Sequence, residues 1–146
     1  MTLKPLTIEE GASNNGATHV AKVTHSDLTE ASANTDQAIA LITVADKVSV
    51  SCVKAVLKTA FTDASDATFN STALEVGDGN DVDELLVSME LNSNGTEVNQ
   101  KTGTTVTHDY AAADTVDANF NAMTAKALNN IDAGEVDIYL RVADSR

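Results

Sequence analysis

The sequence has little of three residue classes on which many folds and functions depend. Its one cysteine, Cys52, excludes an intrachain disulfide framework. Aromatic residues make up only 3% of the 146 residues, and tryptophan is absent. Nine lysine and arginine residues stand against 22 aspartate and glutamate residues, so the formal net charge is −13. A chain with this charge repels polyanions, and we expect it to bind neither nucleic acid nor an anionic membrane surface.

Long apolar runs are also missing from the chain. The longest, Ala38–Ile42, is far shorter than the roughly 20 residues that span a bilayer. The first residues lack the apolar core of a secretory signal, so we expect synthesis in a reducing cytoplasm. The length is that of one domain, and recurring Val, Ile and Leu argue against a disordered chain.

Alternating apolar and polar residues predict β-strands along most of the chain. Short strands separated by turn residues are typical of a sandwich or barrel. We therefore predict an all-β fold, a jelly-roll-like antiparallel β-sandwich over residues 36–146. Residues 1–35 are predicted to form an N-terminal arm and a possible first strand. The predicted strands are Ala17–Thr24, Ala38–Val44, Val48–Phe61, Thr68–Val76, Thr115–Leu128 and Val136–Val142.

Residues 38–61 carry the most detailed local pattern. Ala38–Val44 is almost wholly apolar, which favours a strand covered on both faces. After the polar break Ala45–Lys47, the segment Val48–Cys52 alternates with period two, and the phase slips by one at Val53. Such a slip indicates a β-bulge. The segment is therefore predicted to be a hairpin whose second strand is bulged just after Cys52.

Candidate metal ligands and nucleophiles are few. His19, His25 and His108 have no second ligand at a spacing typical of a metal site, so we interpret them as surface or loop histidines. Cys52 lies on the apolar side of its predicted strand, where a thiol acts as a small buried apolar group. Neither group is predicted to be catalytic.

The segment Gly77–Glu84 is the strongest candidate for an ion site in the sequence. It offers several carboxylate and amide oxygens in a glycine-rich loop, which hard cations such as calcium favour. In the helix-loop-helix calcium pattern, however, Asp78 and Asn80 would be followed by an oxygen ligand at the position of Val82. We interpret the loop as a tight turn with an acidic rim and assign it no metal, and calcium binding stays open.

An enzymatic function is not expected, and no cofactor or catalytic residue is assigned. Glycoside hydrolases use paired carboxylates together with aromatic platforms, and this chain has few aromatic residues. Phe61, Phe69 and Phe120 fall on predicted strands and are expected in the core, which leaves Tyr110 and Tyr139. A small hydrolase with paired aspartates is kept as a third alternative.

Four segments give the chain a family resemblance. Asp36–Val48, the corner Thr59–Asp63, the turn Glu75–Asp81 and the strand Ala133–Val142 resemble, in this order, segments of structural proteins of tailed-bacteriophage virions. The resemblance implies a capsid decoration (cement) protein, a small β-sandwich bound to the outer surface of the shell. No catalytic residue is carried over from this family.

The resemblance also implies the partners. These are the major capsid protein and further copies of the chain in a dimer or trimer, on the exterior of the capsid. We expect the arm Met1–Glu10 to be a contact segment. The alternative is a receptor- or carbohydrate-binding module of a tail or head fibre, which would present an exposed aromatic patch at Tyr110 or Tyr139.

Overall fold

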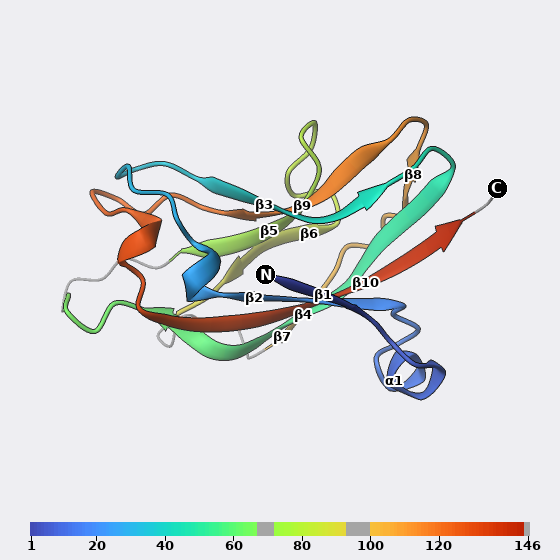
Figure 1. The fold of residues 1–146 in the computed structure, drawn as a ribbon, viewed down its shortest axis with the longest axis horizontal. Coiled ribbons are helices and arrows are strands. Elements are labelled where there is room, and N and C mark those ends of the chain that lie inside the picture. Colours follow the sequence, from blue (N-terminus) through green and yellow to red (C-terminus); the bar gives the residue numbers. More distant parts are fainter. Residues whose placement is uncertain (67–71, 93–99, 145–146) are drawn as a thin grey trace.

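The computed structural model describes residues 1–66, 72–92 and 100–144, and these form two antiparallel β-sheets. Figure 1 shows the sheets as two stacked layers. Sheet A has the order β1 (Thr2–Pro5), β2 (His19–Thr24), β10 (Ala133–Asp144), β4 (Val48–Thr62) and β7 (Gln100–Thr102), with β8 (His108–Tyr110) also paired to β4. Sheet B has the order β3 (Gln37–Val44), β9 (Asp114–Phe120), β5 (Ala73–Gly77) and β6 (Leu86–Glu90). The helical segments are α1 (Ile8–Ser13), η1 (His25–Asp27) and η2 (Leu128–Asn130).

The core lies between the two sheets and follows the predicted alternation. Val136, Ile138 and Leu140 of β10 are fully buried, while the residues between them face outward. From sheet B, Phe120 meets Phe61 of β4 with a ring-centroid distance of 5.8 Å. The all-β, two-sheet sandwich is thus confirmed, and the jelly-roll connectivity in particular stays a prediction.

The predicted bulge after Cys52 is present in the pairing of β4 with β10. Tyr139 pairs with Lys54, and the next residue, Leu140, pairs with Cys52. Val53 is therefore the extra residue on β4, at the position where the apolar phase slips. Cys52 is buried, as expected, and burial raises the pKa of its thiol to about 12.

The predicted hairpin of residues 38–61 is wrong. β3 pairs with β9 in sheet B, whereas β4 belongs to sheet A, so the link Ala45–Lys47 crosses from one sheet to the other. Lys47 turns the chain with a φ of 61°, and its N–H donates to the Tyr110 carbonyl in sheet A. The β3 strand also lies at the edge of its sheet with Ala38 exposed, so it is not covered on both faces.

Other predicted segments agree with the structure in part. The predicted strand at 17–24 is β2, and the one at 136–142 is the middle of β10. The strand predicted over 115–128 ends at Phe120, and the buried side chain of Leu128 packs from the short helix η2. Of the strand predicted over 68–76, residues 73–76 lie in β5, and the part with Phe69 lies outside the described residues.

The first ten residues are part of the ordered fold, and Thr2–Pro5 among them form a strand of sheet A. β1 pairs along its length with β2. Thr7 then begins α1 with a reciprocal cap, since its hydroxyl accepts from the Glu10 N–H and the Glu10 carboxylate accepts from the Thr7 N–H. The expected arm is thus an edge strand followed by a short capped helix.

Two isoleucines provide a matched test of this core. Ile138 is fully buried and Ile8 is 92% exposed. We expect Ile138→Ala to lower the free energy of unfolding by about 2–5 kcal/mol, because it removes buried methyl groups and leaves a cavity. Ile8→Ala should change it by less than about 0.5 kcal/mol. Urea denaturation of both variants measures the difference, and equal losses would contradict the described packing.

Candidate functional site

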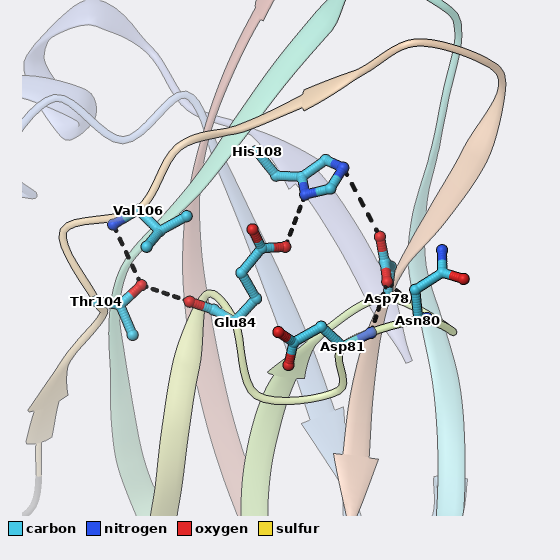
Figure 2. A network of polar contacts seen from close by, with 7 residues as sticks. All are labelled: Asp78, Asn80, Asp81, Glu84, Thr104, Val106 and His108. Atoms are coloured by element: carbon cyan, nitrogen blue, oxygen red, sulfur yellow. Dashed lines mark hydrogen bonds and ion pairs between the residues drawn. The ribbon is translucent and has the colours of Figure 1, made fainter.

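A polar cluster lies at one edge of the sandwich, where the connection between β5 and β6 meets β8 (Figure 2). It consists of Asp78, Glu84 and His108, and we call it the acid–histidine cluster. One ligand atom from each residue lies within 4.8 Å of the other two. Asp78 and Glu84 lie in the connection between β5 and β6 of sheet B, and His108 lies in β8 of sheet A, so the cluster joins the two layers.

The turn after β5 holds Asp78 in place. The Asp78 Oδ1 accepts hydrogen bonds from the backbone N–H of Asn80 at 2.7 Å and of Asp81 at 3.0 Å. The loop folds back over Gly77 so closely that a Cβ there would lie 1.9 Å from the Asp81 carbonyl oxygen. Glycine at 77 is therefore required for the turn. As a result Asp78 is only 2% exposed.

A second set of hydrogen bonds fixes the chain beside Glu84. The Thr104 hydroxyl donates to the Glu84 carbonyl at 2.6 Å, and the Thr104 N–H donates to the Leu85 carbonyl at 2.9 Å. The Leu85 N–H in turn donates to Val76 of β5. These bonds hold the start of β6 against both β5 and the segment that leads to β8, and the Glu84 side chain remains 24% exposed.

His108 completes the cluster from β8, which pairs with β4. Its ring lies against Tyr110, with a centroid distance of 4.3 Å. The Nδ1 atom is 2.6 Å from Glu84 Oε2, and Nε2 is 3.9 Å from Asp78 Oδ2. The imidazole therefore lies between two carboxylates, and 31% of its side chain is exposed.

Negative charge is concentrated around this cluster. Burial raises the pKa of the Tyr110 hydroxyl, and the nearby carboxylates of Asp78, Asp114, Glu84 and Asp117 raise it further. On the adjoining loop, a hydrogen bond with Asp81 raises the pKa of Asp83. A positive charge placed at the cluster would consequently be stabilised by several carboxylates at once.

The sequence-based interpretation of this region is corrected in two respects. Gly77–Glu84 does form a tight turn, but Asp78 is buried and is not part of a solvated rim. His108 is not an isolated loop histidine, because the pairing of β8 with β4 brings it to the two carboxylates. His19 contacts Thr18 and His25 begins η1, and neither belongs to the cluster. No local spacing could reveal the cluster, since Glu84 and His108 are 24 residues apart.

Comparisons of the chain with protein families, with curated proteins and with solved structures found no match. Within the described ranges, no helix has the length and apolar character needed to cross a membrane.

Two glycines in the same turn test how the cluster is built. Gly77→Ala places a methyl group against the Asp81 carbonyl, and we expect it to lower the free energy of unfolding by about 1–3 kcal/mol. Gly79→Ala has open space around its Cβ and should change this free energy by less than about 0.5 kcal/mol. Urea denaturation gives both values, and NMR of the His108 ring reports whether the cluster persists. A neutral Gly77→Ala would contradict the described turn.

Proposed function

We propose that this protein is a non-enzymatic structural component of a tailed-phage virion, a decoration protein that binds the outer surface of the major capsid protein lattice. The two-sheet sandwich agrees with this role, and so do the virion-like segments between Asp36 and Val142. The observation that carries the proposal is the gathering of lysines on the outer face of sheet A, together with the exposed Ile8 of the adjoining α1.

The part of the outer face of sheet A around Asp137 and Tyr139 carries four of the nine basic residues of the chain. On β10 the residues of this face alternate with the buried residues Val136, Ile138 and Leu140. The face continues onto β2 and β1 on one side and onto β4 on the other. The Lys54 ammonium lies 5.0 Å from the centroid of the Tyr139 ring. We call this surface the basic face, and it comprises Lys4, Lys22, Lys54, Lys58 and Tyr139.

The basic face includes a pocket of about 300 Å³ between β1, α1 and β10. Lys4 and Lys22 line it together with Glu10, Asp137 and Tyr139. Lys4 pairs with Glu10 at 2.9 Å, so charges of both signs are present. Burial raises the pKa of Asp137, although Lys22 and Lys58 act in the opposite direction. The basic face is therefore close to neutral in a chain whose net charge is −13.

The charge distribution favours this face as the docking surface. Copies of a strongly acidic protein repel one another and any acidic partner, and the repulsion is weakest where lysines are concentrated. Docking through the basic face also points the remaining acidic surface toward solvent, which keeps a decorated shell soluble. A repeating lattice would hold each copy in the same orientation.

The N-terminal elements beside the basic face offer further contacts. β1 is the last strand of sheet A on its side, so its outer edge can accept a strand from a partner. Ile8 at the start of α1 is 92% exposed. Hydrogen bonds from Thr7 and Lys4 hold the pKa of Glu10 at about 2, so the cap of α1 remains ionised and formed over the physiological pH range. Ile8 is therefore exposed on a capped helix that is formed before any partner binds.

The proposed mechanism is mechanical. A sandwich that contacts neighbouring capsid subunits adds interface area to the shell. These added contacts must also be broken before the shell can disassemble. A symmetric dimer or trimer of the chain would span several subunits at once, and binding through several weak contacts gains strength from their linkage.

The second candidate function is a receptor- or carbohydrate-binding module. The pocket beside Tyr139 favours it, since an aromatic ring next to polar side chains suits a sugar ring. Tyr110, the other expected aromatic contact, is buried beneath His108 and cannot contribute to an exposed patch.

Charge and apolar substitutions on the basic face and α1 test the docking surface. We expect Ile8→Asp and Lys58→Glu each to weaken binding to undecorated shells about tenfold or more, a loss typical of one important interface contact. Asp at the start of α1 is compatible with the helix dipole, so Ile8→Asp should fold normally. Cosedimentation of the purified protein with shells of the phage that encodes it measures the affinity.

Lys47→Glu is the matched control for these variants. It changes the net charge by the same amount as Lys58→Glu but lies in the exposed link between β3 and β4, away from the basic face. Its affinity for shells should equal that of the unaltered protein. If the unaltered protein binds no shells, or if Lys47→Glu weakens binding as much as Lys58→Glu, the proposed docking surface is wrong. Binding on a glycan array that is lost in Tyr139→Ala would support the second candidate instead.

A further inference from the structure

The acid–histidine cluster contains a gap between two groups that can each hold a cation. When Nδ1 of His108 donates its hydrogen to Glu84 Oε2, the neutral imidazole presents the Nε2 lone pair on its other side. That lone pair faces Asp78 Oδ2 at 3.9 Å, which is too long for a hydrogen bond. Two acceptors thus face each other across a space that a positive ion would fill.

We propose that His108 and Asp78 bind one divalent cation, with Zn²⁺ as the ion that fits best, and that Glu84 positions the His108 ring. Zn²⁺ lies about 2.0–2.2 Å from nitrogen and oxygen ligands, and tetrahedral coordination places two such ligand atoms about 3.4 Å apart, so Nε2 and Oδ2, which are 3.9 Å apart, need to approach by only roughly 0.5 Å to bind one ion. Ca²⁺ and Mg²⁺ take oxygen ligands, so the imidazole distinguishes this site from a calcium loop.

The surroundings of the cluster are those of a preorganised metal site. A histidine that binds a metal commonly donates its other ring N–H to a carboxylate, as His108 does to Glu84. Asp78 is 98% buried, and two backbone N–H groups hold its Oδ1, which leaves Oδ2 directed at His108. The side chains of Glu84 and His108 are partly exposed, which gives the ion and its water ligands a way in.

Metal binding here would act on the fold as well as on the site. Asp78 follows β5 of sheet B and His108 lies in β8 of sheet A, so one ion would connect the two layers. An ion that binds the folded chain and not the unfolded one stabilises it by linkage. This property is independent of the proposed capsid docking, since the cluster and the basic face share no residue.

Calorimetric titration of ZnCl₂ into EDTA-treated, dialysed protein at pH 7.5 tests the proposal. We expect one saturable site per chain and a rise in the melting temperature that EDTA reverses. His108→Gln and Asp78→Asn should each weaken binding at least tenfold, and Asp78→Asn keeps an oxygen for the turn. Glu84→Gln should weaken binding about tenfold, as expected when a group that orients a metal ligand is altered. His25→Gln is the control and should bind like the unaltered protein.

NMR of the unaltered protein gives a readout that does not depend on how the variants fold. Zn²⁺ should shift the ring signals of His108 and leave those of His19 and His25 in place. The proposal is overturned if Zn²⁺ gives no saturable binding or if the His108 signals do not move. It is overturned equally if Ca²⁺ binds as tightly as Zn²⁺ and His108→Gln has no effect, because carboxylates alone would then attract the ion.

Discussion

The antiparallel pairing of β4 with β10 is the interaction on which the rest of this structure depends. β10 pairs with β2 on its other side, and β4 pairs with both β7 and β8, so sheet A is assembled around these two long strands. Their inward residues, such as Ile138 and Leu140, form one wall of the core. The bulge at Val53 keeps those residues facing inward along strands that would otherwise change phase.

The core between the sheets is built largely from aliphatic side chains, with Phe61 and Phe120 as its aromatic pair. At the edge where β8 meets the β5–β6 connection, polar groups replace these apolar contacts between the layers. The bond between His108 and Glu84 joins the sheets there, with Asp78 held close by its own turn. Carboxylates gather around this edge, while lysines gather on the outer face of sheet A. The two regions therefore suit different partners, a cation and a protein surface.

Local patterns predicted those features that depend on neighbours in the sequence. The alternation in Val136–Val142 identified the central strand, because a half-buried strand needs apolar residues at every second position. The slip at Val53 located the bulge, and the glycines at 77 and 79 indicated the turn. The same patterns wrongly predicted that β3 is covered on both faces, because hydropathy does not distinguish an exposed alanine such as Ala38 from a buried one. They also predicted that the strand starting at residue 115 ends too late, because residues outside the strands, such as Leu128 in η2, are buried as well.

The amino-acid sequence by itself determined that the chain is acidic, that it forms β-strands, that one strand bulges at Val53 and that the chain turns after β5. These properties depend on composition and on contacts between near neighbours. Only the tertiary structure decided that β3 and β4 belong to different sheets and that His108 lies beside Asp78 and Glu84. Strand pairing joins residues far apart in the chain, and alternation shows which face of a strand is buried but not which strand lies next to it.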